Sequence, residues 1–200
     1  MIVSVHFGPI CCYLGVSMKE ELISAMKHAV ITLNKHPSRD VLVIHHNDTD
    51  GLSSGAILKG SFLQAGYKPH CLSLEKPYPQ ILKKLLAPQG RIIILADFAG
   101  KIAPLIVELN QIRNLVIILD HHPAERVEDP SVFNLDGSLY GLRGDQDISA
   151  SATCYLFADQ LLRNVGMDGT AYSHLGVLGA VGDGFFVDGA LSGVNRKILE

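Results

Sequence analysis

Three short apolar runs, separated by segments with a helical pattern, dominate the middle of this chain. Each has the length and the β-branched content of a buried strand, so we expect strands at residues 41–44, 91–96 and 114–119, and residues 69–74 predict a further strand between the first two. The segments between them predict helices at residues 52–65, 77–87 and 102–112. Strands that alternate with helices predict an α/β domain with a doubly wound, mainly parallel sheet and helices on both faces.

The flanking segments complete one domain, or one and a half, in 200 residues. Helical spacing predicts a helix at 17–35. After Pro123 the chain is polar and rich in turn residues, with a short strand at 131–135 and helices at 149–165 and 170–181. We interpret residues 1–17 as an N-terminal arm or a mis-called start, residues 18–188 as the catalytic domain, and residues 189–200 as the start of a linker.

Composition limits the classes of protein that fit. A hydrophobic fraction of 48% supplies a substantial core, and a net charge of −3 with a pI near 6.3 excludes a binder that relies on a basic surface. A nucleic-acid substrate stays open, because bound divalent cations would reverse the local charge. The four cysteines have no zinc-ligand spacing, and no apolar run reaches the ~18 residues of a membrane span. We therefore expect a cytoplasmic protein without a membrane partner.

Acidic and imidazole side chains gather where three of the expected strands end. In a parallel sheet these ends share one edge, where ligands bind in open α/β sheets. Carboxylate and imidazole groups suit manganese or a similar divalent ion. Six to eight candidates are too many for one ion but suit two ions that share a bridging carboxylate. The candidates are His45, His46, Asp48, Asp50, Asp97, Asp120, His121 and His122.

Several of these residues also have simpler interpretations. Asp48 or Asp50 could serve as the N-cap of the following helix, and so could Asp97 for its own helix. Asp183 lies between two glycines, where turn chemistry alone would explain it. Gly51 would allow a sharp turn and expose backbone N–H groups to phosphate oxygens.

The pattern resembles the DHH phosphoesterase family, which is named for the triplet Asp120-His121-His122. Its four motifs match here in order, over about residues 40–183, and the Leu-Ser-Ser-Gly-Ala-Ile segment after Gly51 is similar to the RecJ-like branch. The resemblance implies hydrolysis of phosphoester or phosphoanhydride bonds with two divalent ions, manganese first and Mg²⁺ or Co²⁺ as alternatives. The motifs are residues 46–51, Asp97-Phe98, residues 120–122 and residues 179–183.

The resemblance also implies a role for each matching residue. Asp97 would bridge the two ions, Asp120 would orient the site or assist as a ligand, and His122 would face the phosphate. His45 has no clear counterpart. The helix start at residues 149–153 is similar to a family segment near the site, although an ordinary serine N-cap explains it at least as well. The implied metal ligands are His46, Asp48, Asp50, Asp97, His121 and Asp183, the catalytic groups are Asp120 and His122, and the phosphate-binding or substrate-binding groups are Gly51, Ser149 and Ser151.

The substrate stays open at this point. Single-stranded nucleic acid or short oligonucleotides fit the RecJ-like motif, whereas other branches act on pyrophosphate or on small nucleotides. A non-catalytic scaffold for replication or repair is a further alternative, although every motif position is filled here. The family usually carries a second, substrate-binding domain with a glycine-histidine-rich motif, which we expect beyond residue 200.

Overall fold

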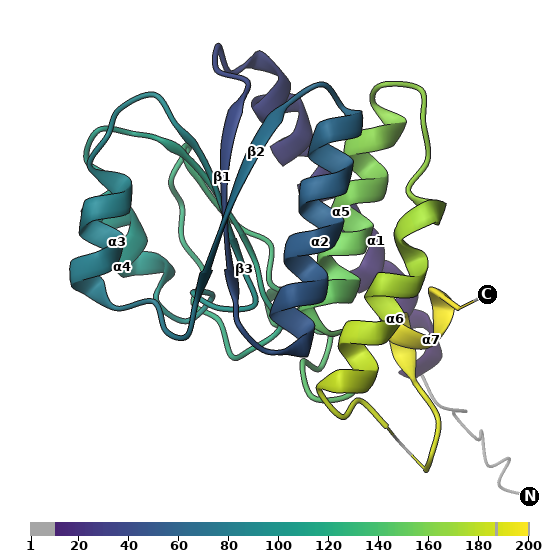
Figure 1. The fold of residues 1–200 in the computed structure, drawn as a ribbon. Helices are drawn as coiled ribbons and strands as arrows, with labels where there is room; N and C mark the ends of the chain where they lie inside the picture. The colour runs from purple at the N-terminus through teal and green to yellow at the C-terminus, as the bar shows by residue number, and fades with distance from the viewer. Residues whose placement is uncertain (1–10, 187, 200) are drawn as a thin grey trace, which may run out of the picture.

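The computed structural model describes residues 11–186 and 188–199, with the side chains described from Lys19 onward. Part of the expected N-terminal arm, residues 1–10, lies outside the described residues. Figure 1 shows a central sheet with a helical layer on each side. None of the helices in the described part of the chain is both long enough and apolar enough to cross a membrane.

The sheet has five strands in the order β2-β1-β3-β4-β5, and every neighbouring pair is parallel. This confirms the predicted fold class and four-strand alternation, and the short run after Pro123 adds the fifth strand. Since β1 lies between β2 and β3, the strand order reverses beside β1, which is the usual place for a ligand site. The strands are β1 (Asp40–His46), β2 (Lys68–Leu74), β3 (Ile92–Ala96), β4 (Leu115–Leu119) and β5 (Val132–Asn134).

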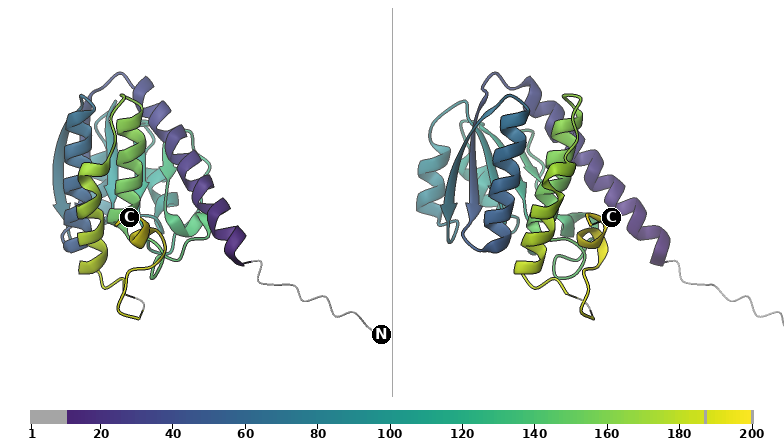
Figure 2. Two further views of the ribbon diagram at one scale, coloured as in Figure 1. Left: turned by 90° about the vertical axis from the view of Figure 1, so that its right-hand side faces the viewer. Right: turned by 45° about the vertical axis from the view of Figure 1, so that its right-hand side comes forward.

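The helices cover the two faces unequally. Alternate strand residues point to opposite faces, so Ile92 and Ile94 pack into one apolar cluster while Ile93 and Leu95 pack into the other. One face is covered by α1, α2 and α5 with α6 outside them, and the other by the short α3 and α4 (Figures 1 and 2). The bounds are α1 (Cys11–Lys35), α2 (Thr49–Gln64), α3 (Pro79–Leu86), α4 (Ala103–Leu109), α5 (Ala150–Arg163) and α6 (Ser173–Gly182).

Three features differ from the expectations. Helix α1 begins at Cys11, and two short 3₁₀ helices, η1 (Gly137–Tyr140) and η2 (Thr170–Tyr172), lie in the C-terminal half. The segment expected to start a linker contains α7 (Gly193–Lys197), in which Val194 and Asn195 are buried. Residues 191–198 therefore pack into the domain, because they cover apolar surface and supply a buried amide. The boundary at residue 188 and the second domain stay predictions.

Candidate metal centre

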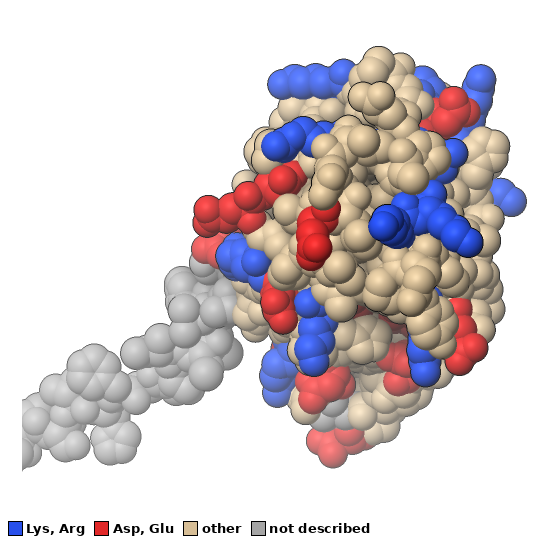
Figure 3. Space-filling view, turned by 90° about the vertical axis from the view of Figure 1, so that its left-hand side faces the viewer, with Lys and Arg blue, Asp and Glu red and all other residues tan. Residues whose placement is uncertain are grey.

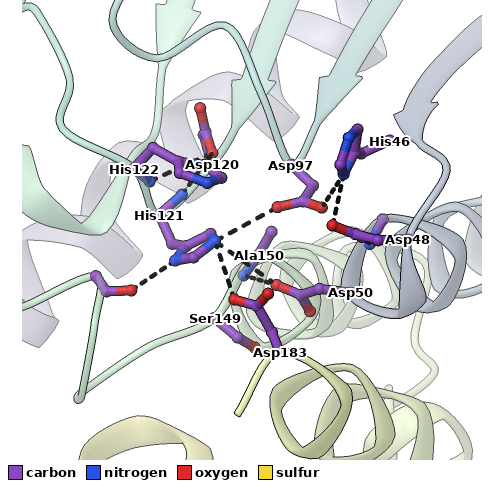
Figure 4. A network of polar contacts seen from close by, with 12 residues as sticks. His46, Asp48, Asp50, Asp97, Asp120, His121, His122, Ser149, Ala150 and Asp183 are labelled. Carbon is purple, nitrogen blue, oxygen red and sulfur yellow. Dashed lines mark hydrogen bonds and ion pairs between the residues drawn. The ribbon is translucent and has the colours of Figure 1, made fainter. Parts of the chain in front are cut away.

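The carboxyl ends of β1, β3 and β4 bring the predicted site residues to one edge of the sheet (Figure 4). His46 ends β1, Asp97 follows β3, and Asp120, His121 and His122 follow β4. Helix α2 begins beside them, and Asp183 is the C-cap of α6. Segments more than 100 residues apart in sequence thus meet at one point.

The potential ligand atoms form three overlapping groups, each with its atoms within 4.8 Å of one another. Asp97 belongs to two of them, as expected of a residue that is shared between two sites. His121 also belongs to two. The groups are His46, Asp48 and Asp97; Asp50, His121 and Asp183; and Asp97, Asp120, His121 and His122.

Asp97 lies at the centre of the site, with a left-handed backbone conformation and a buried side chain. Its backbone has φ +65°, in the left-handed region, and its side chain is 2% exposed. Oδ1 lies 3.4 Å from His121 Nε2 and Oδ2 lies 3.5 Å from His46 Nδ1, yet Oδ2 has no hydrogen-bond partner. Burial and then the charges of Asp50 and Asp48 raise the pKa of Asp97 to about 7, against the opposing effect of His121. A buried carboxylate oxygen without a donor, among further carboxylates, fits a cation.

His121 is held with one nitrogen facing the acidic groups. Its Nδ1 lies 2.5 Å from the carbonyl oxygen of Gly144, which fixes this nitrogen as the donor. Nε2 lies 3.4 Å from Asp97, 3.7 Å from Asp183 and 3.9 Å from Asp50. Burial lowers the pKa of His121, but Asp97, Gly144 and Asp50 together raise it to about 10. A divalent ion would take the place of that proton, because the same nitrogen is the one available for coordination.

Asp120 holds His122 from behind. Its Oδ1 lies 2.8 Å from His122 Nδ1 and accepts the backbone N–H of His121 at 2.8 Å, while Oδ2 accepts the N–H of Gly100 at 2.9 Å. Burial alone would raise the pKa of Asp120, but the hydrogen bond and charge of His122 keep it below its ordinary value. Since protein donors use both oxygens, Asp120 is placed to orient its neighbours. The His122 side chain is 54% exposed, so Nε2 can reach a substrate.

Asp48 and His46 form the rim of the centre. Asp48 is the N-cap of α2, because its Oδ1 accepts the N–H of Gly51 at 2.9 Å. The N-cap interpretation of Asp48 is thereby confirmed. Its other oxygen, Oδ2, lies 2.6 Å from His46 Nδ1 and remains part of the ligand group. Asp97 caps no helix, because α4 has Ile102 at its N-cap.

Asp50 is fully buried and binds the start of α5. Its Oδ2 accepts the N–H of Ala150 at 2.8 Å and its Oδ1 accepts that of Ser151 at 2.9 Å. The Ser149 hydroxyl accepts from Ala152 N at 3.1 Å, and Ser149 N donates to Asn195 Oδ1 at 3.0 Å. Side chains therefore satisfy all four N–H groups that a helix start leaves open.

The three groups predicted to bind phosphate, Gly51, Ser149 and Ser151, make their contacts within the fold. Ser149 and Ser151 are fully buried, and the Ser151 hydroxyl donates to the carbonyl of Gly176 at 2.9 Å. Both serines hold the fold together, and the N-cap interpretation of Ser149 is confirmed. The N–H of Gly51 is used by Asp48, and a Cβ at Gly51 would lie 2.5 Å from His46. Gly51 therefore permits close packing of α2 against β1, and its N–H does not face outward to a phosphate.

Three groups that support the site residues were not predicted from the sequence. The Gly144 carbonyl orients His121, the Gly100 N–H orients Asp120, and Asn195 fixes the residue that caps α5. Two are backbone atoms in loops, which no side-chain pattern reveals. The glycine in each of these loops is a sequence signal for close packing there. At Gly144, for example, a side chain would overlap the carbonyl oxygen of His121. His45, in contrast, is buried beneath Gly55 and belongs to none of the three ligand groups.

Two hollows flank His122. The larger, of about 630 Å³, is lined by His121, Asp183 and Phe185 together with the exposed Arg143. The smaller, of about 330 Å³, lies on the other side and is lined by Asp97 with Lys76 and Lys101. Acidic side chains also line both hollows, with Asp145 in the larger and Glu75 in the smaller, so the basic groups do not form a continuous surface.

Comparison with known proteins places this geometry in context. No protein-family profile matches the sequence. An uncharacterized protein of Methanocaldococcus jannaschii is 31% identical over 162 residues, which cover 80% of this chain and 36% of that protein. The chain thus spans about a third of that relative's length.

Solved structures resemble the chain over most of its length. The exonuclease RecJ bound to manganese matches with a TM-score of 0.69 and 21% identity, over 88% of this chain and 46% of RecJ. RecJ of Thermus thermophilus in complex with Mn²⁺ gives 0.68 and 20%, over 88% of this chain and 26% of that one. CDC45 of Entamoeba histolytica gives 0.50 and 15%, over 84% and 33%. These similarities concern the fold.

Proposed function

We propose that this chain, which folds as a RecJ-like DHH domain, is a metal-dependent phosphodiesterase acting on single-stranded nucleic acid or short oligonucleotides. The observation that carries the proposal is the position of Asp97, shared by two groups of ligand atoms and holding a buried oxygen without a donor. The RecJ structures with the same fold were solved with manganese, which supports Mn²⁺ as the ion.

The residues that would hold two ions follow from the groups. One set is His46, Asp48 and Asp97, and the other is Asp50, His121 and Asp183. Asp97 also lies beside the second set, because its Oδ1 is 3.4 Å from His121 Nε2, so it could serve both ions. When bound, two such ions would lower the pKa of a water molecule and offset the charge on phosphoryl oxygens.

The protein itself would position the reactants and stabilise charge. His122 is fixed by Asp120, and this hydrogen bond raises the pKa of His122, which shifts the ring toward its protonated form. Its Nε2–H can then donate a hydrogen bond to a phosphoryl oxygen as negative charge develops there. The His121 ring is held by the hydrogen bond from its Nδ1 to the Gly144 carbonyl.

A polymeric substrate is favoured over pyrophosphate by the two hollows. Lys76 and Lys101 line the smaller hollow, so a phosphate next to the scissile one could pair with them there. Arg143 lines the larger hollow but pairs with Asp147 at 3.0 Å, so it would have to exchange that partner to bind a phosphate. The face over α3 and α4 mixes basic and acidic side chains and offers no broad basic surface (Figure 3). Binding would therefore depend on the hollows themselves. We also propose a reducing, cytoplasmic location, in keeping with the free thiols of Cys71 and Cys154.

The test compares hydrolysis of bis-p-nitrophenyl phosphate, a single-stranded oligonucleotide and pyrophosphate in the presence of Mn²⁺. Asp97→Ala and His121→Ala should abolish hydrolysis of both phosphodiesters, whereas His70→Ala, at an exposed position on β2, should keep it. Retained activity in both site variants would refute the proposal. Release of phosphate from pyrophosphate without phosphodiester cleavage would favour the pyrophosphatase alternative.

A further inference from the structure

The loop at residues 143–147, which carries the carbonyl group that orients His121, is closed at its two ends by Arg143 and Asp147. Asp147 Oδ2 accepts the backbone N–H of Arg143 at 2.9 Å and its Nε–H at 3.0 Å, while Oδ1 accepts Nη2–H at 3.0 Å. The backbone N–H of Asp147 donates back to the carbonyl of Arg143 at 2.7 Å. The ends of the loop are therefore joined both through their side chains and through their backbones.

Gly144 lies within the closed loop and packs directly on His121. Its carbonyl oxygen accepts the hydrogen bond from His121 Nδ1, and a Cβ atom at Gly144 would overlap the carbonyl oxygen of His121. The loop thus contacts both the ring and the backbone of this histidine. A change in the shape of the loop would move the carbonyl that fixes the ring.

The other end of the loop lies against the start of α5, which binds Asp50. Asp147 precedes the helix by two residues, and its backbone carbonyl accepts the N–H of Val194 at 2.6 Å and that of Asn195 at 3.3 Å, both in α7. The side chain of Asn195 in turn accepts the N–H of Ser149, the N-cap of α5. The loop, α7 and the start of α5 therefore form one hydrogen-bonded unit beside Asp50.

We propose that Asp147 is a positioning residue for one of the two ions. Its side chain fixes the shape of the loop, and the loop holds His121 at one end and the helix start that binds Asp50 at the other. The inference rests on the proposed function, because it concerns the bound ion, but the hold on the His121 ring can be measured without metal. The group that depends on the loop is Asp50, His121 and Asp183, whereas His46, Asp48 and Asp97 come from β1, the start of α2 and the end of β3.

The pair of Arg143 and Asp147 differs from an ordinary surface ion pair. Their side chains are 62% and 20% exposed, and an exposed pair on its own stabilises a fold only weakly. Here the carboxylate also accepts a backbone N–H, and two bonds from one guanidinium fix its orientation. Arg143 also lines the larger hollow, so a role in binding phosphate is the alternative that the second experiment separates.

A second ion pair of the same spacing provides a matched control. Arg163 Nε lies 2.7 Å from Asp159 Oδ2, and the two side chains are 62% and 14% exposed. Asp159 Oδ1 also accepts a backbone N–H, that of Gly169, at 3.1 Å. This pair belongs to the C-terminal half of α5, whereas Asp50 binds the opposite end of that helix. Asp159→Ala therefore removes an equivalent pair without altering the loop.

The first experiment follows the His121 Nδ1 proton by NMR in the full chain, in EDTA at neutral pH. His121→Ala identifies the signal by its absence. Asp147→Ala should raise the rate of exchange of this proton with solvent by about tenfold or more, and Asp159→Ala should leave it within about threefold of the wild type. An unchanged rate in Asp147→Ala would overturn the proposal. A wild-type proton that exchanges too fast to be observed would equally contradict a held ring.

The second experiment titrates the full chain with Mn²⁺ in a calorimeter. Asp147→Ala should weaken one of two binding steps by about tenfold, as expected for a group that supports a ligand, and leave the other within about threefold. Asp147→Asn keeps one oxygen acceptor for the Arg143 N–H and should fall between the Ala variant and the wild type. Asp159→Ala should bind as the wild type does.

Two results of the titration would overturn the role of Asp147. One is equal weakening of both steps. The other is wild-type affinity for Mn²⁺ in Asp147→Ala together with a raised KM for the phosphodiester, which would assign the pair to substrate binding. Absence of any Mn²⁺ binding by the wild type would refute the proposed function and the link to the ion, while exchange of the His121 proton would still report the hold of the loop on the ring.

Discussion

Removal of the Asp50 side chain should destabilise the protein even when no metal is bound. The carboxylate accepts the first two N–H groups of α5 in a fully buried position. Each bond to a charged acceptor contributes about 1.5–3 kcal/mol, so the pair contributes about 3–6 kcal/mol. Relief of the repulsion between Asp50 and Asp97 offsets part of this. We expect Asp50→Ala to lower the free energy of unfolding by about 3 kcal/mol, and Tm by about 10 °C.

The assay is denaturant unfolding of the metal-free protein in EDTA, so that any ligand role of Asp50 makes no contribution. Asp48→Ala is the matched control, because Asp48 caps α2 through one N–H in a half-exposed position. Its loss should cost about 1 kcal/mol. If Asp50→Ala unfolds within about 1 kcal/mol of the wild type, or no more easily than Asp48→Ala, the structural role of Asp50 is refuted.

Three further outcomes are expected. Gly144→Ala should weaken manganese binding by about 10–100-fold in calorimetry, because the new Cβ overlaps the His121 carbonyl, and wild-type affinity would contradict this. Phe157→Ala should lower the free energy of unfolding by about 3–5 kcal/mol, because this fully buried ring packs near Phe62, and a loss below about 1 kcal/mol would exclude that core contact. Asp136, the buried N-cap of η1, has its pKa raised to about 6 by burial and then by the charge of Asp120. Because this exceeds the unfolded value, the wild type should lose about 2 kcal/mol of stability relative to Asp136→Asn as pH rises from 4 to 7, and a constant difference would refute the shift.

Much of the fold could be predicted because its signals are local. Apolar runs at β3 and β4 are buried on both faces, so their position follows from hydrophobicity alone. The common edge of the strands followed from the parallel sheet, which brought Asp97 and His121 together as expected.

The supporting contacts could not be predicted, because they join distant residues. Asp50 and Ala150 meet across 100 residues, and nothing near either in sequence indicates the pair. The same holds for Ser149 and Asn195. The burial of Asp136 could not be predicted either, since its turn with Ser138 has the same pattern as the turn of Asp129 with Ser131, yet Asp136 is fully buried and Asp129 is 17% exposed.

The central claim is that Asp97 is shared between two cation sites. Its most direct test is a crystal structure with manganese, read by anomalous scattering at the manganese edge. Two peaks on either side of Asp97 are expected, one against His46 and Asp48 and one against Asp50, His121 and Asp183. Asp97→Ala should lose both peaks or keep one at reduced occupancy. A single peak that does not contact Asp97, or none at saturating manganese, would contradict the account.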